Sequence, residues 1–518
     1  MKIIIILLVS ILAFVGCDDN YLEEVPKDFT SVENFFRNED DAVAAVNSVY
    51  ASFLDIQSYR FFALTELSTE TTTSRNIPNA ASHFSALDDM VYVSPATYNL
   101  YFCWLRYYQT ISRANYVLAN VGDMDESKFN DTSLKDRVIG EAYFMRALNY
   151  FYLVRFFGGV PLRINYIESV NDAENIVRNT EAEVYNQIIA DLEEAISRLP
   201  QGSTYSGSDI GRASQGAAKA LLAKVYLQRG SICANNGITG DRLIAQSADF
   251  QKTASYCQEV IDSGEYGLVA CEGLWGFDAI DNNGEIIFRG EHSLSNITSA
   301  AIMIYRYVAL LNANFINASE IFTSQLDFYK EFSSNDIRKS VIFYTQYVKN
   351  GNTIIYNIDD PANDGFSSDT PTYTKYLEEG NNPYGTDDMI LRYADVLLMK
   401  AEALNEVNNG PTADAYNAIN QVRNRAGLDD LAGLSYTDFK KAVYIERQKE
   451  FVMEGHGWFD SQRYFSFYKE RQEASSGYTE YRFGPSVKVV LQDPKHRLMP
   501  IPQTAIDYNP LLEQNPGW

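Results

Sequence analysis

Two long stretches of the chain, 55–100 and 265–385, combine aromatic rings with amide, imidazole and guanidinium groups that could bind a ligand. The candidate ligand-binding residues are Arg75, Asn76, His83, Phe84, Tyr92, Tyr98, Trp275, His292, Asn296 and Tyr305. Sugar rings present apolar C–H faces edged by hydroxyls, and flat aromatic side chains with nearby hydrogen-bonding groups complement such rings. The same side chains could instead serve only to pack the loops, so both interpretations remain open.

The sequence contains no arrangement of residues that is typical of an enzyme. It has no HExxH motif, no GxSxG elbow, no P-loop and no GxGxxG motif after a strand. The 4 histidines are far apart and lack ligand-like spacing. We therefore expect no catalytic residue, no metal site and no cofactor. Acids four residues apart, such as Glu402 and Glu406, are interpreted as a solvated helix face, although a glycosidase would also need two carboxylic acids.

The composition predicts a folded protein with an acidic surface. Hydrophobic residues make up 46% of the 518 residues, and 36 tyrosines supply rings that also carry a hydroxyl. The formal net charge is -25, from 43 Lys and Arg against 68 Asp and Glu. Such a charge repels polyphosphates, so nucleic acid is excluded as the expected partner.

The N-terminus has the pattern of a segment that is removed during export. Lys2 precedes an apolar run, Ile3 to Val15, that is too short to span a bilayer, so residues 1–16 are expected to be a signal peptide. Phe14-Val15-Gly16-Cys17 resembles a bacterial lipobox, in which Cys17 would be lipidated. Residues 17–30, which are acidic at the start, would then form a tether. The alternative is an ordinary secretory peptide with an incidental cysteine.

The stretch from Glu141 to Leu162 is expected to be the central helix of the core. Apolar residues lie on nearly every side of its helical wheel, so other elements must surround it. Gly158 and Gly159 can cap its end and Pro161 cannot continue it.

Helical periodicity recurs on both sides of this helix. The further helices are expected at Asp40–Leu54, Tyr101–Val121, Thr180–Leu199, Ser214–Arg229, Ser247–Asp262, Asp387–Val407, Asp414–Arg425 and Thr437–Phe451. Small residues crowd their inner faces, as in the run 216–227, which is typical of tetratricopeptide-type hairpins, although no strict repeat is found.

The remaining segments are expected to be mostly irregular. Short strands are expected at Glu285–Arg289 and Thr353–Ile358, and the proline-rich tail from Leu498 to Trp518 is expected to be extended rather than helical. The cysteines are too few for a disulfide framework, and a bridge between Cys257 and Cys271 remains an open alternative to buried thiols.

Seven segments together identify the chain as similar to the SusD/RagB family of outer-membrane, glycan-binding lipoproteins of Bacteroidetes. They are SRANYVLANV (112–121), EAYFMRALNYFYLVRFFGGVPL (141–162), GRASQGAAKALLAKVYL (211–227), LRYADVLLMKAEALNE (391–406), INQVRNRAGL (419–428), IERQKEFVMEGHGWFDSQRY (445–464) and the tail ending LMPIPQTAIDYNPLLEQNPGW. One departure is Gly457, where relatives commonly carry a larger residue.

The resemblance implies a non-catalytic lipoprotein, attached to the outer membrane through Cys17 and facing the cell surface. It would capture oligosaccharide and deliver it to a SusC-like TonB-dependent β-barrel. The implied fold is all-α, a superhelical scaffold of tetratricopeptide-like hairpins with a long loop-rich region. The family's motifs belong to the scaffold, so they identify no binding residue. A structural lipoprotein that grips a protein or peptide with its hairpins is the alternative.

We therefore expect one domain over 31–518. Its scaffold would comprise about 31–54, 101–264 and 387–470, its ligand-binding region about 55–100 and 265–385, and its tail 498–518.

Overall fold

The computed structural model describes most of the chain, with gaps. The described residues are 35–56, 59–74, 84, 87–88, 98–166, 176–236, 246–275, 283–291, 321–349, 351–357, 371–375, 387–467, 470 and 495–518. The structural statements below concern these residues.

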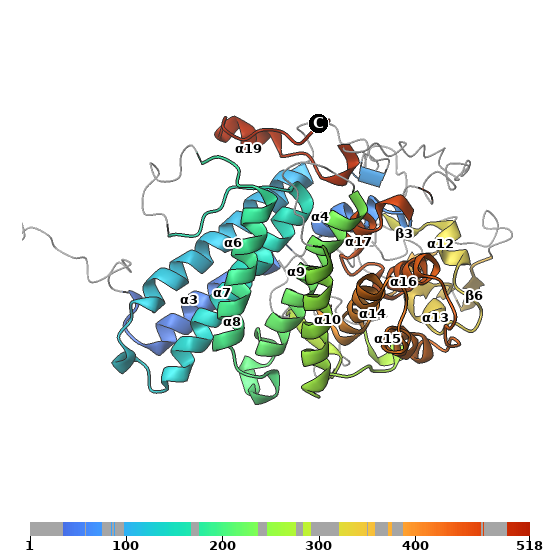
Figure 1. The fold of residues 1–518 in the computed structure, drawn as a ribbon, viewed down its shortest axis with the longest axis horizontal. Coiled ribbons are helices and arrows are strands. Elements are labelled where there is room, and N and C mark those ends of the chain that lie inside the picture. The colour runs from blue at the N-terminus through green and yellow to red at the C-terminus, as the bar shows by residue number, and fades with distance from the viewer. Residues whose placement is uncertain are drawn as a thin grey trace, which may run out of the picture.

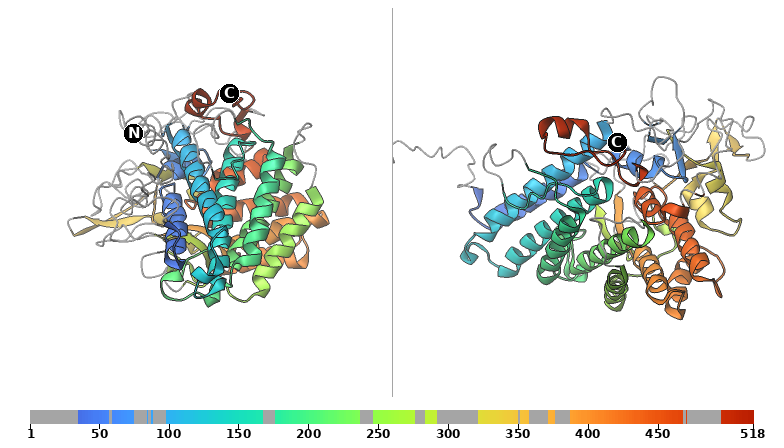
Figure 2. Two further views of the ribbon diagram at one scale, coloured as in Figure 1. Left: turned by 90° about the vertical axis from the view of Figure 1, so that its left-hand side faces the viewer. Right: turned by 45° about the horizontal axis from the view of Figure 1, so that its top comes forward.

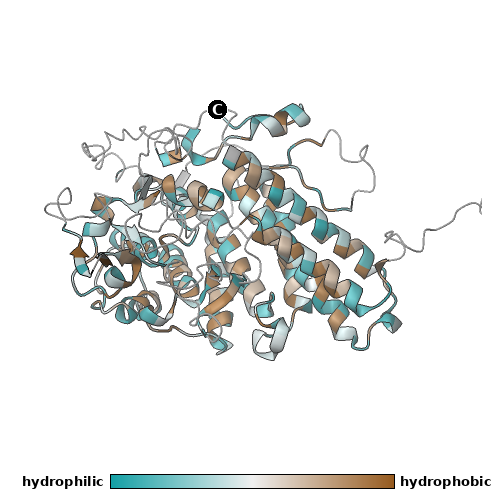
Figure 3. Ribbon diagram, turned by 180° about the vertical axis from the view of Figure 1, so that it is seen from behind, coloured by the Kyte–Doolittle hydropathy of each residue, from teal (hydrophilic) through white to brown (hydrophobic). Residues whose placement is uncertain are grey.

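Long helices, packed against one another, form the body of the protein and confirm the all-α prediction. They are α3 (Glu39–Leu54), α6 (Tyr98–Gly122), α7 (Thr132–Phe157), α8 (Glu181–Arg198), α9 (Gln215–Asn236), α10 (Gln246–Asp262), α14 (Tyr393–Asn408), α15 (Ala413–Arg425) and α16 (Tyr436–Phe451). From α6 to α14 the helices follow one another across the molecule as a curved row of hairpins (Figures 1 and 2). Seen from behind, they show both hydrophilic and hydrophobic residues along their length (Figure 3).

Shorter elements connect this row to the rest of the chain. They are α4 (Tyr59–Phe62), the π-helix η2 (Ala63–Leu67), η3 (Glu126–Lys128), η5 (Gly202–Thr204), η6 (Gly207–Asp209), η7 (Cys271–Gly273), α12 (Leu326–Lys330), α13 (Arg338–Ile342), α17 (Gly457–Arg463), η9 (Lys495–Arg497) and α19 (Gln503–Tyr508). No helix within the described ranges has the length and apolar character needed to cross a membrane.

Helix α7 occupies the centre predicted for it. It begins earlier than expected, with Asp131 as its N-cap, and ends where predicted, because Gly158 has a φ of 74° and its amide bonds back to Val154. Nearly all of the predicted segment is buried, and Leu148 is 1% exposed. Helices α3, α6 and α8 pack around it, which accounts for a helix that is apolar on every side.

The strands form three small sheets beside the helices. The order of the first sheet is β1 (Thr72–Ser74), β3 (Phe322–Ser324), β7 (Thr372–Tyr373) and β4 (Phe343–Tyr344). The strand β2 (Ile286–Gly290) pairs with β8 (Asp388–Arg392), and β5 (Gln346–Lys349) forms a hairpin with β6 (Asn352–Ile355). All of the pairs are antiparallel.

The structure corrects three sequence-based predictions of local structure. Residues 388–392 form a strand rather than the first turn of a helix, because Tyr393 begins α14 only after β8 has paired with β2. The tail contains the short helix α19, which starts after Pro502, a residue that is compatible with a helix start. Cys257 and Cys271 are both buried free thiols, so the alternative of a bridge between them is wrong.

A fourth correction concerns the residues 59–74 within the first stretch that was expected to be irregular. They form α4, the π-helix η2 and β1, and almost all of their side chains are buried in the core. The π-helix is a rare element that often accompanies function. Its Glu66 carboxylate accepts a hydrogen bond of 2.8 Å from the amide of Gly455.

Gly457 is in direct contact with this π-helix, which accounts for its small size. A Cβ atom on Gly457 would lie 2.8 Å from the carbonyl oxygen of Thr65 and 3.2 Å from Oε2 of Glu66. A larger residue would push η2 away from the start of α17.

The buried Glu66 carboxyl is expected to make the protein less stable as the pH rises. Burial raises its pKa from 4.5 to about 8, against the lowering effect of hydrogen bonds from Met453 and Gly455. Below about pH 4.5 both states hold the proton. Above that pH the unfolded chain loses the proton while the folded one keeps it, so stability falls until Glu66 ionises near pH 8.

We expect Glu66→Gln to remove this pH dependence and to stabilise the protein by on the order of 3 kcal/mol at pH 8. Urea unfolding of both proteins at pH 5, 6.5 and 8 measures the difference. Glu194→Gln, at a side chain that is 48% exposed, serves as the control and should leave the pH dependence unchanged. A parallel pH dependence of wild type and Glu66→Gln would contradict the prediction.

Candidate ligand-binding site

Most of the predicted ligand-binding residues lie outside the described residues. This applies to Arg75, Asn76, His83, Tyr92, His292, Asn296 and Tyr305, and also to the expected lipidation site, Cys17. Tyr98 is the first residue of α6, Phe84 lies in the core, and Trp275 follows η7. The geometry of the site can therefore be described only from the residues that flank these segments.

Two of the sheets, the four-stranded one and the pair β2–β8, bring together points where these segments join the fold. Ser74 pairs with Phe322, so the start of the segment after residue 74 lies beside the end of the segment before residue 321. Gly290 pairs with Asp388, so the segment after residue 291 starts beside the end of the segment before residue 387. In each sheet, two stretches that are distant in sequence thus emerge side by side, as a shared site requires.

Two contacts attach the first stretch to this sheet. Phe84 is 1% exposed, and its ring contacts the rings of Tyr59 and Phe322 at centroid distances of 5.9 and 5.6 Å. The carboxylate of Asp88 accepts hydrogen bonds from the hydroxyl of Thr73 at 2.7 Å and from the amide of Ser74 at 2.8 Å. Phe84 therefore packs the stretch onto the sheet, and its ring is covered by protein.

Trp275 is the predicted site residue whose surroundings are best described. Trp275 is half-buried, and the Nζ atom of Lys375 lies over its ring at 4.5 Å from the centroid, a distance typical of a cation–π contact. The guanidinium of Arg392 lies 5.9 Å from the same ring. The indole N–H is buried and has no acceptor among the described residues. The ring is thus held from within the fold.

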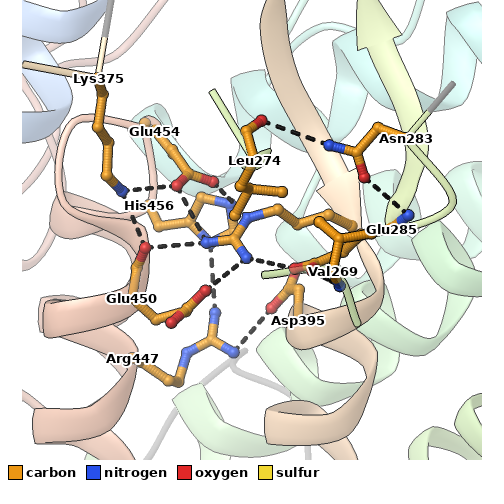
Figure 4. A network of polar contacts seen from close by, with 12 residues as sticks. Val269, Leu274, Asn283, Glu285, Lys375, Asp395, Arg447, Glu450, Glu454 and His456 are labelled. Carbon is orange, nitrogen blue, oxygen red and sulfur yellow. Dashed lines mark hydrogen bonds and ion pairs between the residues drawn. The ribbon is translucent and has the colours of Figure 1, made fainter. Parts of the chain in front are cut away.

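The cations beside Trp275 belong to a buried network of ion pairs (Figure 4). Lys375 donates to the Glu454 carboxylate at 2.7 Å and to the carbonyl of Glu450 at 2.9 Å. Arg392 bonds to Glu285 at 2.7 Å, to Glu450 at 2.6 Å and to Glu454 at 2.8 Å. The network joins Glu285, which precedes β2, and Arg392 of β8 to the end of α16, and so fixes the cations that contact Trp275.

Glu450 is the centre of this network. Its carboxylate also accepts from Arg425 and, at 3.1 Å, from Arg338. Burial alone would raise the pKa of Glu450, but the charges of Arg425, Arg392 and Arg338 hold that pKa well below its ordinary value. Burial likewise lowers the pKa of Lys375, while the charge of Glu454 opposes that shift.

A second buried cluster extends the network to helices α9, α14 and α17. Asp395 pairs with Lys224 at 2.9 Å and with Arg447 at 2.7 Å. His456 stacks on Phe451 at 4.6 Å, and burial holds its pKa well below the ordinary value, so the imidazole is neutral. Asp395 and Arg447 are buried, His456 is nearly so and Lys224 is partly buried, so the cluster serves the fold.

Glu402 and Glu406 are not a solvated face, which corrects the sequence-based interpretation. Glu402 is 2% exposed and pairs with Arg463, while Glu406 pairs with Lys440 at 2.6 Å. The partners of these acids lie on α16 and α17. The spacing of the two acids within α14 therefore could not reveal these ion pairs.

Comparison with known proteins agrees with this architecture. Residues 20–227 match a family model described as starch-binding associating with outer membrane, and residues 309–518 match the SusD family model. The SusD-like protein P2 of Formosa agariphila is 30% identical over 88% of this chain and 89% of its own length. The SusD-like protein P25 of the same organism is 27% identical over 99% of this chain and 98% of its own length.

Solved structures share the whole fold. A SusD homolog from Bacteroides thetaiotaomicron superposes with a TM-score of 0.80 and 25% identity, over 94% of this chain and 98% of that chain. A laminarin-binding SusD-like protein superposes with a TM-score of 0.72 and 23% identity, over 93% and 100% of the two chains. From the extent of these matches, the chain belongs to the SusD/RagB family.

Proposed function

We propose that this protein binds oligosaccharide through the loop segments that leave the four-stranded sheet and the β2–β8 pair, and does not alter it chemically. The observation that carries the proposal is the Trp275 indole. It is supported from within the fold by Lys375, partly exposed, and placed where separate loop segments join the scaffold. An aromatic ring held in place loses little conformational freedom when a sugar stacks on it.

The family supports the same ligand class. One matching family model is described as starch-binding, and a laminarin-binding protein has the same fold. The proposed site would comprise Trp275 together with Arg75, Asn76, His83, Tyr92, Tyr98, His292, Asn296 and Tyr305, with Phe84 packing one of the loops.

We also propose how the protein is attached to the membrane and to which partner it delivers its ligand. Lipid on Cys17 would anchor the protein in the outer membrane, facing the cell surface, and the captured sugar would pass to a SusC-like TonB-dependent β-barrel. The family description, which names association with the outer membrane, supports this location. Co-purification of such a barrel with the full-length protein tests the partnership.

Trp275→Ala is expected to weaken oligosaccharide binding by about 30-fold, because a buried aromatic anchor contributes about 2 kcal/mol or more to an interface. Isothermal calorimetry of the mature protein, with a glycan selected by array screening, measures the change. Trp275→Phe keeps an aromatic face and should retain part of the affinity.

Tyr508→Ala is the matched control for this test. Tyr508 is 80% exposed on α19, so removing its ring should change neither stability nor binding. Equal affinities for wild type and Trp275→Ala would contradict the proposal, as would equal losses from both substitutions.

A further inference from the structure

A groove runs along β2, between that strand, α3 and the loop that contains η6. It consists of two adjoining cavities of about 290 and 350 Å³. The residues shared by the two linings are Ile210, Gly211, Arg212, Phe288 and Arg289. Each cavity is close to the lower limit of about 300 Å³ for small-molecule sites, so together they can hold an extended ligand.

Three tyrosine rings form fixed walls of the groove. The hydroxyl of Tyr50 accepts from the amide of Ala213 at 3.1 Å, and the hydroxyl of Tyr205 donates to the carbonyl of Ala213 at 2.8 Å. The hydroxyl of Tyr266 lies 3.2 Å from that of Ser214. All three hydroxyls thus bond to one short segment, Ala213 and Ser214, and little side-chain freedom remains to be lost on binding.

The two arginines that line the groove, Arg212 and Arg289, are already paired with carboxylates. Arg212 bonds to Glu141 at 3.0 Å, to Asp209 at 2.7 Å and to Asn47 at 2.9 Å. Arg289 bonds to Glu291 at 2.7 Å. An anionic ligand would have to compete with these carboxylates, whereas hydroxyl groups can share the remaining hydrogen-bonding capacity.

Gly211, which lines both cavities, lies against Glu291, which lines the second. Gly211 has a φ of 92°, and a Cβ atom there would lie only 2.0 Å from Oε1 of Glu291, so only glycine leaves room for this carboxylate. The Glu291 side chain is 47% exposed, which leaves it accessible from the groove.

The groove leads toward residues of the proposed site at both ends. At one end Asn283 lines it, and the Asn283 amide donates to the carbonyl of Leu274, the neighbour of Trp275 in sequence. At the other end Glu291 lines it and directly precedes His292. Each end of the groove thus lies next to a residue that adjoins a proposed site residue in sequence.

We infer that this groove holds the continuation of an uncharged oligosaccharide chain, in contact with the rings of Tyr50, Tyr205 and Tyr266. The inference rests on the proposed function and adds to it that the ligand is a neutral glycan of several units. Ile210, which is 48% exposed and lines both cavities, contributes an apolar surface for the sugar faces.

The dependence of affinity on the length of the oligosaccharide provides the test. Calorimetry would use three-unit and seven-unit oligosaccharides of β-1,3-glucan, α-1,4-glucan, β-1,4-mannan and β-1,4-xylan, with oligogalacturonates as the charged probe. For a neutral series, the wild type should bind the seven-unit chain about 10-fold more tightly than the three-unit chain, a difference of about 1.4 kcal/mol. Ile210→Asp should remove this gain and leave the three-unit affinity unchanged, and the milder Ile210→Ala should reduce the gain.

The control for Ile210→Asp is Val348→Asp, which changes a residue of similar type that is 57% exposed on β5 and outside the groove. Equal seven-unit affinities for the two variants, no gain with length in the wild type, or tighter binding of oligogalacturonate would overturn the inference.

Trp275→Ala separates this inference from the proposed function. Loss of binding for both lengths in Trp275→Ala, with Ile210→Asp unaffected, would support the proposed function and overturn the groove. Unchanged binding in Trp275→Ala, together with loss of the length-dependent gain in Ile210→Asp, would support the groove and overturn the role of Trp275. Absence of binding by every probe would overturn both.

Discussion

Leu148→Asp is expected to prevent the protein from folding. Leu148 is 1% exposed at the centre of α7, where α3, α6 and α8 cover the helix. The substitution removes buried apolar contacts, a change that costs about 2–5 kcal/mol when leucine becomes alanine. It also places a carboxylate where no partner compensates for lost hydration. The sum is comparable to the whole stability of a domain, which is about 5–15 kcal/mol.

The yield of monodisperse protein and its far-UV circular dichroism measure this effect. Leu105→Asp supplies the control on the neighbouring helix α6, where the side chain is 38% exposed and can hydrate the new charge. A cooperative melting transition of Leu148→Asp close to that of the wild type would show that α7 is not the central element.

Glu450→Gln is expected to lower the free energy of unfolding by about 3–5 kcal/mol, the usual cost of removing one partner from a buried ion pair. The amide has nearly the same shape as the carboxylate but carries no charge. It would leave Arg338, Arg392 and Arg425 without the acid that they share. Because these arginines join β8, α13, α15 and α16, a single substitution affects several elements.

The midpoint of urea unfolding measures this loss. Glu194→Gln again serves as the comparison, because Glu194 pairs with Arg198 at 3.1 Å on the surface of α8 and such exposed pairs contribute about 0–1 kcal/mol. If the two variants lost the same stability, the network would not contribute as argued.

Sequence patterns predicted the helical scaffold well, because a helix that buries one face leaves a period in its own residues. Helix α8 shows this most clearly. Thr180 was expected to open it, and Thr180 and Glu183 form a reciprocal capping box there. The strand β8 was missed, because a short apolar run has no period that distinguishes a strand from a buried helical turn.

Polar residues of the core were the least predictable. The run from Thr65 to Ser74 consists almost entirely of hydroxyl and carboxyl side chains, yet nearly all of them are buried. Tyr444 and Gln448 of α16 donate to the carboxylate of Glu70 at 2.6 Å, across hundreds of residues of sequence. No local sequence pattern indicates such partners, because buried polar groups form hydrogen bonds with residues that only the fold places beside them.

By itself, the sequence determined the helical scaffold, the central position of α7 and the likeness to a family, since these depend on local periodicity and on contiguous motifs. Only the tertiary structure decided that Phe84 packs a loop while Trp275 stays partly exposed above buried cations. It also decided that the hydroxyls of three tyrosines bond to the same short segment, Ala213 and Ser214. The physical reason is that exposure and ion pairing are properties of neighbours in space, and these neighbours lie far apart along the chain.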